Sequence, residues 1–140
     1  MRQISVIILV LCLAVPGALA AKPSPEKQIE IFFDSLRKAG SDGAIKFLTA
    51  DTLLFAQKSA LLSNTRVQFD AAMAIYGSPT RYEISRTDQL SASLIRIRLI
   101  SFHDNGMPLF WSFTFLKNRD QWEALAFSFN DEFTKVFPLN

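Results

Sequence analysis

Histidine and cysteine, two residue types that often carry out acid–base, nucleophilic or metal chemistry, are scarce in this 140-residue chain. The sequence holds one histidine, His103, and one cysteine, Cys12. A histidine titrates near neutral pH and can act as a base, but His103 has no acid at a fixed spacing, and its place beside a turn predicts a solvated side chain. One histidine does not make the usual zinc site. We therefore predict no catalytic residue, no bound metal and no cofactor.

Four other polar side chains are of the kind that orients a ligand. Pockets for small molecules are mostly apolar and hold a few placed polar groups. Two phenols, Tyr76 and Tyr82, and two hydroxyls, Ser112 and Thr114, lie among apolar residues in the sequence. We expect these four to line an inner cavity if the protein binds a small apolar molecule. No predicted strand places an acid in the middle of the inner face of the sheet.

The stretch FWSFTF, residues 110–115, holds four aromatic rings, and IRIR, residues 95–98, precedes it in the same predicted hairpin. The sequence DNG, residues 104–106, lies between them. Asn-Gly favours positive φ at both central positions of a two-residue type I′ turn. Such a turn predicts a register in which Ile100 lies opposite Trp111.

This register divides the hairpin into two faces. The face without central charges is expected to turn toward the helices, because burying an arginine without an acid costs several kcal/mol. It comprises Ile95, Ile97, Leu99 and Ser101 with Phe110, Ser112, Thr114 and Leu116. The outer face carries Arg96 and Arg98 beside Trp111, Phe113 and Phe115. Aromatic rings and arginines are enriched at interfaces, which predicts a contact surface there; the alternative is that the tail FTKVFPLN, residues 133–140, covers this face within one monomer.

The helices are expected in the first half of the mature chain. Ser24-Pro25-Glu26 is typical of a helix start, and an apolar stripe follows at the i, i+3, i+4 and i+7 spacing. The predicted helix ends at Gly40, and shorter helices begin after Asp42 and Asp51. A Thr-x-x-Gln capping box over residues 65–68 predicts the start of the last long helix, which ends at Gly77.

After Pro79 the apolar period changes from about 3.6 to 2, which predicts four strands. These are RYEISR (81–86), SLIRIRLISFHD (93–104), MPLFWSFTFLK (107–117) and QWEALAFSFND (121–131). A two-residue turn at residues 119–120 would direct Leu125, Phe127 and Phe129 inward. Helices followed by an antiparallel meander indicate the α+β class.

Three segments, IYGSP (75–79), RYEIS (81–85) and WEALAFSFND (122–131), together with this order of elements, resemble the nuclear-transport-factor-2-like superfamily. The resemblance covers residues 24–133. It implies a cystatin-like cone, in which N-terminal helices pack on a curved antiparallel sheet of about four strands. It also implies homodimers through the open sheet face. The fold hosts enzymes as well as binding domains, and the superfamily's enzymes use a His–Asp pair or an Asp base with tyrosine.

The first twenty residues are predicted to be a secretory signal peptide, with cleavage after Ala20. The alternative is a retained membrane anchor, but residues 16–17, Pro-Gly, interrupt the apolar run. We expect one mature domain over residues 21–140, exported to the periplasm or the medium without a stable membrane anchor. Removing Arg2 leaves 15 − 1 = 14 basic and 13 acidic residues, a balance that does not predict nucleic-acid binding.

Two functions remain open on these grounds. The first is a non-enzymatic exported domain that associates with a partner protein or with itself through the outer sheet face. The alternative is a binder of a small apolar ligand, or an isomerase- or lyase-like enzyme, that uses the inner cavity. A filled cone favours the first function, and an open cavity with a buried acid favours the second.

Overall fold

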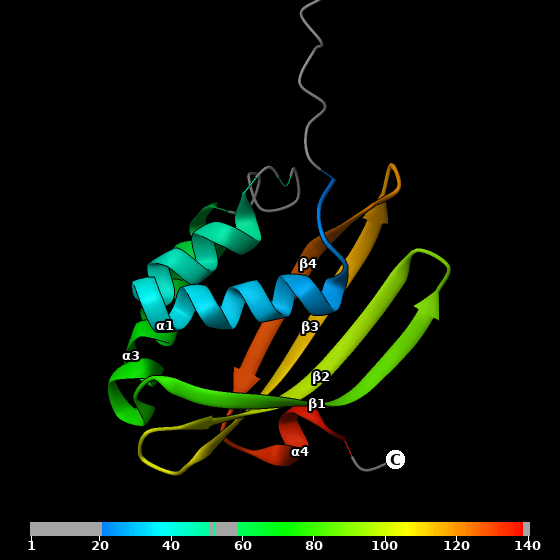
Figure 1. Cartoon of the computed structure of the whole chain (residues 1–140). Helices are drawn as coiled ribbons and strands as arrows, with labels where there is room; N and C mark the ends of the chain where they lie inside the picture. The colour runs from blue at the N-terminus through cyan, green and yellow to red at the C-terminus, as the bar shows by residue number, and fades with distance from the viewer. Residues whose placement is uncertain (1–20, 51, 53–58, 139–140) are drawn as a thin grey trace, which may run out of the picture.

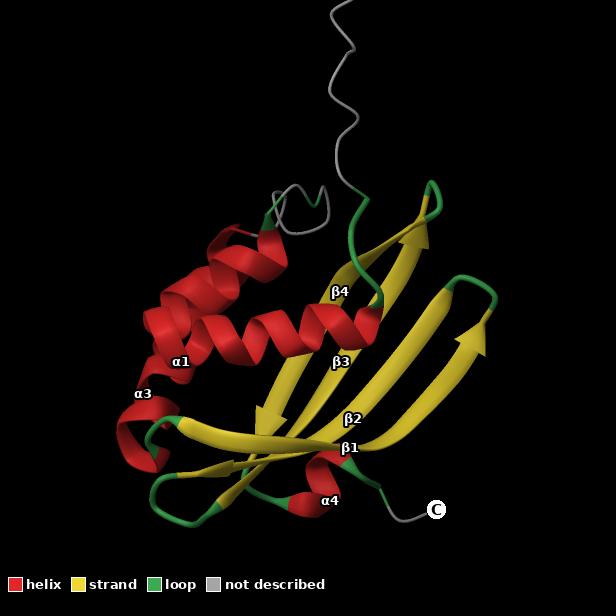
Figure 2. Cartoon of the chain, in the orientation of Figure 1, coloured by secondary structure: helices red, strands yellow, loops and turns green. Residues whose placement is uncertain are grey.

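A computed structural model describes residues 21–50, 52 and 59–138 of the chain. In chain order the elements are α1 (Pro25–Thr49), α3 (Ser59–Tyr76), β1 (Pro79–Ser91), β2 (Leu94–His103), β3 (Pro108–Asn118), β4 (Gln121–Asn130) and α4 (Phe133–Val136) (Figures 1 and 2). The predicted signal peptide, residues 1–20, and the helix start predicted at Asp51 lie outside the described residues. None of the helices in the described ranges is both long and apolar enough to cross a membrane.

Helix α1 begins where the sequence predicts. The Ser24 side chain accepts a hydrogen bond from the backbone N–H of Lys27 at 3.3 Å, and Pro25 is the first helical residue. At Gly40 the backbone leaves the helical region with φ of 68°, which produces a kink inside α1. Glycine tolerates this left-handed conformation because it has no Cβ. The predicted stop at Gly40 is therefore a kink between two helical segments.

Helix α3 begins earlier than predicted. It extends from Ser59, so the Thr-x-x-Gln sequence over residues 65–68 lies inside the helix and does not cap it. Its predicted end is confirmed, since Gly77 has φ of 78° and its N–H donates to the carbonyl of Met73 at 2.9 Å.

The four strands form one antiparallel sheet in the order β1-β2-β3-β4, which confirms the α+β prediction. Helices α1 and α3 pack on one side of this sheet, here called the inner face, and the short α4 lies on the other, the outer face (Figures 1 and 2). Strand β1 is an edge strand with three register irregularities against β2. Such bulges twist an edge strand and make it a poor template for pairing with another chain.

The turn between β2 and β3 differs from the prediction, and this changes the faces of the hairpin. The N–H of Gly106 donates to the carbonyl of His103 at 2.9 Å, and only Gly106 of the DNG sequence has positive φ, at 79°. This is the pattern of a three-residue loop, a type I turn followed by one left-handed residue, and not of a type I′ turn. The extra residue places Leu99 opposite Trp111, where Ile100 had been predicted.

A shift of one residue moves every side chain of a strand to the other face. The prediction for β2 holds: Ile97, Leu99 and Ser101 are buried on the inner face. For β3 it was wrong. Trp111, Phe113 and Phe115 are 0% exposed beneath the helices. The three rings belong to the monomer core, and the exposed contact surface predicted from them does not exist.

The turn between β3 and β4 agrees with the prediction. Arg119 and Asp120 have φ of 47° and 65°, and Asn118 pairs with Gln121 across this two-residue turn. A bulge then shifts the register, because Phe115 pairs with Ala124 whereas Thr114 pairs with Ala126. Leu125 lies in the bulge without a partner on β3 and is not among the residues that pack against the core, so its predicted inward position is not confirmed.

Beyond the bulge, the predicted inward positions of Phe127 and Phe129 are confirmed. The Phe127 ring lies 6.0 Å from that of Phe113, and the Phe129 ring lies 5.1 Å from that of Trp111. On the other side of the bulge, Ala124 takes an inner, buried position.

Aromatic rings from both layers fill the inner face. Phe32 of α1 lies 5.2 Å from Phe113 and 5.7 Å from Trp111, measured between ring centroids. Phe69 of α3 lies 5.6 Å from Trp111 and 5.4 Å from Phe129. Edge-to-face and offset contacts of this kind stabilise a core beyond the area that they bury. The helices thus attach to the sheet through a closed ring cluster.

Candidate binding site on the outer face of the sheet

The four residues predicted to line an inner cavity lie at three different places. Ser112 and Thr114 are on the outer face, because the register of β3 is shifted. Tyr82 lies on the inner face, where its ring stacks on that of Phe33 with centroids 4.6 Å apart. Burial raises the pKa of the Tyr82 phenol, so this side chain stays protonated and packs as part of the core margin.

Tyr76 lies at the mouth of the inner face. Its phenol donates a hydrogen bond to Oδ2 of Asp131 at 2.9 Å, and this bond raises the pKa of Tyr76. A shallow pocket of about 330 Å³ adjoins the pair. Its lining also includes Ile75, Leu109 and Phe129. The predicted polar group is thus present, but it is tied to the end of β4 and is separated from Ser112 and Thr114 by the sheet.

His103 is buried, with 3% of its surface exposed, and the predicted solvated position was wrong. Its Nδ1 lies 2.9 Å from the carbonyl oxygen of Gly77, and its Nε2 lies 2.7 Å from Oγ of Ser101. The indole N–H of Trp111 donates to the same Oγ at 2.7 Å. Burial lowers the pKa of His103. A neutral imidazole that donates from Nδ1 and accepts at Nε2 satisfies all three contacts, which indicates a structural role.

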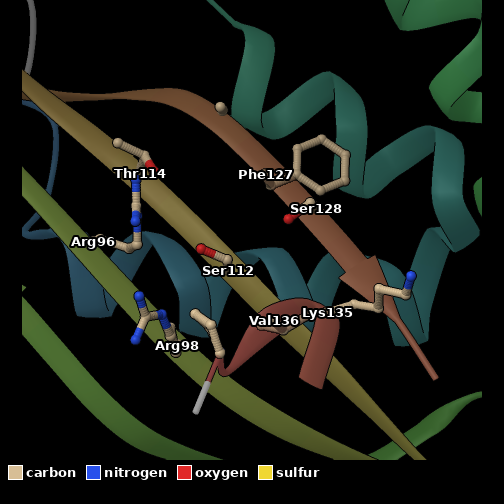
Figure 3. Close-up of a pocket in the computed structure, with 10 residues that line it drawn as sticks. Arg96, Arg98, Ser112, Thr114, Phe127, Ser128, Lys135 and Val136 are labelled. Carbon is tan, nitrogen blue, oxygen red and sulfur yellow. The ribbon is translucent and has the colours of Figure 1, made fainter. Parts of the chain in front are cut away.

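The outer face holds an open pocket of about 330 Å³, near the lower end of the range for small-molecule sites. Figure 3 shows it from the side of α4, with α1 behind the strands. Polar side chains of three neighbouring strands form its floor: Arg96, Arg98, Ser112, Thr114 and Ser128. Lys135, Val136 and Pro138 contribute from α4 and the residues after it. We call this site the outer pocket.

The antiparallel register accounts for this grouping. Arg96 lies opposite Thr114, and Arg98 lies opposite Ser112, which in turn faces Ser128 on β4. Side chains at directly opposed positions on one face have Cβ atoms about 4.5–5.5 Å apart. Two arginines and three hydroxyls are therefore held together by regular backbone pairing, without any contribution from a loop.

The charges of the outer pocket are only partly compensated. Asp88 on β1 lies 3.5 Å from a guanidinium nitrogen of Arg98 and also accepts from Nε of Arg86 at 2.5 Å. One carboxylate thus serves two guanidinium groups. Arg96 has no ion-pair partner within 4 Å among the described residues. Glu123, the next acid on this face, lies opposite Leu116 and does not line the pocket.

The C-terminal tail lies on the outer face. The Phe110 ring contacts Phe133 and Phe137, with centroids 5.5 and 6.1 Å apart. The described part of FTKVFPLN therefore covers part of this face within one monomer, as the alternative prediction stated, and its residues Lys135, Val136 and Pro138 line the outer pocket beside Arg96 and Thr114. Arg96 and Arg98 do not lie beside Trp111, Phe113 and Phe115 as predicted, whereas the guanidinium of Arg81 lies 3.8 Å from the centroid of the Phe102 ring.

Sequence reasoning missed Asp88, because the predicted strand RYEISR ends at residue 86 whereas β1 continues to Ser91. The alternation that directs Phe127 and Phe129 inward already placed Ser128 on the outer face, and Lys135 and Val136 belong to the tail that the alternative prediction placed there. The sequence did not indicate that these residues line one pocket with Arg96 and Arg98.

Comparison of the chain with protein-family models, with curated proteins and with solved structures gave no match. The chemistry of the outer pocket and the closure of the inner face are therefore the observations that bear on function.

Proposed function

We propose that this protein is an exported, non-catalytic binding domain that takes up its ligand on the outer face of the sheet. The observation that carries the proposal is the contrast in polar groups between the two faces. The outer pocket holds the guanidinium of Arg96 and the hydroxyls of Ser112, Thr114 and Ser128, and none of these has a hydrogen-bond partner elsewhere in the described chain. Polar groups that point into an open pocket without protein partners are available to a ligand.

The inner face supports the same proposal by its closure. Phe32, Phe69 and Trp111 are 0% exposed and in mutual contact, which leaves no room for a substrate between the helices and the middle of the sheet. The polar network there, His103 with Ser101 and Trp111, is internally satisfied. A binding function on the outer face is therefore favoured over an enzyme or apolar-ligand site in the cone.

The nature of the partner changes with the corrected register. The contact surface was predicted from three rings that are buried on the inner face, so Trp111, Phe113 and Phe115 cannot serve as the aromatic anchors that dominate protein interfaces. The arginines are still on the outer face, and they favour a small ligand as the partner. This ligand is either free or carried by a partner protein. We retain membership of the nuclear-transport-factor-2-like superfamily as part of the proposal; the helices-then-meander order supports it.

A fragment titration followed by NMR tests the location of the binding surface. ¹⁵N-labelled protein covering residues 21–140 is titrated with a mixed library of neutral, cationic and anionic fragments. We expect amide shifts to cluster on residues 96–98, 112–114 and 126–128. Shifts confined to Tyr76, Asp131 and the pocket beside them would contradict the proposal, as would the absence of any clustered shifts.

Export is tested separately from binding. N-terminal sequencing of the protein from its native host should find a chain that begins at Ala21, since the A-x-A sequence predicts cleavage after Ala20. A chain that begins at Met1 and sediments with membranes would show that the leader is retained as an anchor.

A further inference from the structure

The outer pocket has an excess of positive charge that is held in place by the sheet. Arg98 is 14% exposed, and it shares the carboxylate of Asp88 with Arg86. Arg96, one position along the same face of β2, has no carboxylate within ion-pair distance in the described chain. In Figure 3 its side chain lies alongside Thr114, and the Arg98 guanidinium lies next to it on the same strand. Two cations and one shared anion leave the pocket positive.

The hydroxyls next to the arginines add donors of the right kind. Ser112 lies opposite Arg98, and Thr114 lies opposite Arg96, across the β2–β3 ladder. A guanidinium presents planar N–H groups that match a carboxylate or a phosphate in bidentate geometry. Hydroxyl donors beside it can satisfy the remaining oxygen lone pairs of such an anion. Arg96, Ser112 and Thr114 therefore converge as a donor set for one oxyanion.

The walls of the outer pocket limit what can carry that oxyanion. Val136 and Pro138 provide an apolar side of the pocket. Figure 3 shows the ammonium group of Lys135 directed away from the arginines and across β4. A volume of about 330 Å³ admits a small organic anion. It leaves little space for a folded partner domain to insert.

We propose that the outer pocket binds a small soluble anion through its carboxylate or phosphate group, held by Arg96 with the hydroxyls of Ser112 and Thr114. This inference rests on the proposed function, because it assigns the ligand class of the same face. Arg98 has a positioning role, because its ion pair with Asp88 fixes β2 beside β1 at the pocket. Val136 contacts the apolar part of the ligand.

Isothermal titration calorimetry of protein covering residues 21–140 with inorganic phosphate and with succinate tests the proposal. We expect one-to-one binding of at least one of the two anions. Arg96→Gln should weaken it about tenfold or more, since a charge-assisted contact is lost. Ser112→Ala and Thr114→Val, which keep the charge, should each weaken it several-fold. The matched control is Arg119→Gln, which removes the same charge from an exposed turn outside the pocket and should leave the affinity unchanged.

The outcomes separate the ligand class from the binding surface. Equal weakening by Arg96→Gln and Arg119→Gln would overturn the proposal, because net charge alone would then account for binding. An absence of binding by either anion, combined with neutral or cationic fragments that shift outer-face amides, would overturn the oxyanion assignment and leave the proposed function standing. Anion binding that shifts only amides around Tyr76 would overturn both.

Discussion

The two faces of the β2–β3 hairpin are built from alternate residues of the same strands, yet they differ in almost every physical property. On the inner face, Trp111, Phe113 and Phe115 have no exposed surface, and Trp111 contacts rings from both helices. On the outer face, Ser112 and Thr114 lie in an open pocket beside arginines. One face stabilises the protein, and the other holds polar groups without protein partners.

The difference shows how a single turn residue determines which surface a protein presents. With a two-residue turn, the rings would lie beside Arg96 and Arg98 and form an aromatic contact surface. Because the loop has three residues and ends with Gly106 in the left-handed conformation, the rings enter the core and the hydroxyls join the arginines. The groups beside the two arginines change from aromatic rings to hydroxyls without any change in composition.

The largest expected effect is the difference between two substitutions at neighbouring positions of β3 whose side chains lie on opposite faces of the sheet. Phe113→Ala should lower the free energy of unfolding by about 3–5 kcal/mol, because it leaves a cavity in the ring cluster. Thr114→Ala, on the other face, should change it by about 0.5 kcal/mol or less. Urea unfolding of both variants measures the contrast. Equal effects would mean that the two faces are not distinct in the way the structure shows.

A smaller effect is expected on β4, where burial is incomplete. Phe127 contacts Phe32 and Phe113 but is only half-buried. Phe127→Ala should therefore cost about 2–3 kcal/mol, toward the lower end for a buried aromatic residue. Ser128→Ala is the matched control on the outer face. A cost below about 1 kcal/mol for Phe127→Ala would place the ring on the surface and contradict the bulge at Leu125.

The turn itself can be tested at Gly106. A Cβ at this position meets no atom within 4 Å, so a substitution costs only the backbone conformation. Left-handed φ costs an L-residue roughly 1–2 kcal/mol, and Gly106→Ala should lower stability by about that amount in a urea melt. Gly106→Asn should cost less, since asparagine tolerates this region better. Equal stability of all three proteins would contradict the left-handed turn.

The smallest predicted effect is a dependence of stability on pH that comes from His103. Burial depresses the folded-state pKa of His103 below its ordinary value of 6.5, against smaller opposing effects of the Gly77 carbonyl and Asp104. Tyr76 and Ser101 are the other groups that face the ring. Below pH 6.5 the unfolded chain then binds a proton that the folded chain does not. Stability should fall as the pH drops from 7 through 6.5 toward the folded pKa.

His103→Gln provides the comparison for this pH dependence. The variant should have a lower overall stability, because the contact with Ser101 changes. Its stability should not show the fall that His103 causes as the pH drops from 7 to 5. Urea melts at half-unit pH intervals measure both slopes. Parallel slopes for the two proteins would show that His103 is protonated equally in the folded and unfolded states.

Much of the fold could be predicted because the apolar periodicity changes once, after Pro79, and stays regular on either side. The start of α3 could not, because the capping-box pattern over residues 65–68 also fits a helix interior. The DNG sequence was ambiguous for a similar reason. It fits a two-residue and a three-residue loop equally well, and nothing local decides whether Asn105 takes positive φ.

The sequence identified the main residues of the candidate site, but it did not predict that they lie together. Arg96 and Arg98 were assigned to an interface and Ser112 and Thr114 to a cavity, because the predicted register put the pairs on opposite faces. The burial of His103 could not be foreseen either. Its partners, Ser101 and the carbonyl of Gly77, come into reach only when the end of α3 packs against the β2–β3 turn.

The division of the sheet into a closed inner face and an open outer face is tested most directly by the fluorescence of Trp111. Trp122→Phe removes the other tryptophan of the chain and leaves Trp111 as the sole reporter, with an aromatic ring kept at position 122 and no new charge. Because Trp111 is 0% exposed, its emission should be blue-shifted and resistant to quenching by iodide until urea unfolds the protein. Red-shifted emission that iodide quenches in the folded state would place Trp111 on the outer face and contradict the account.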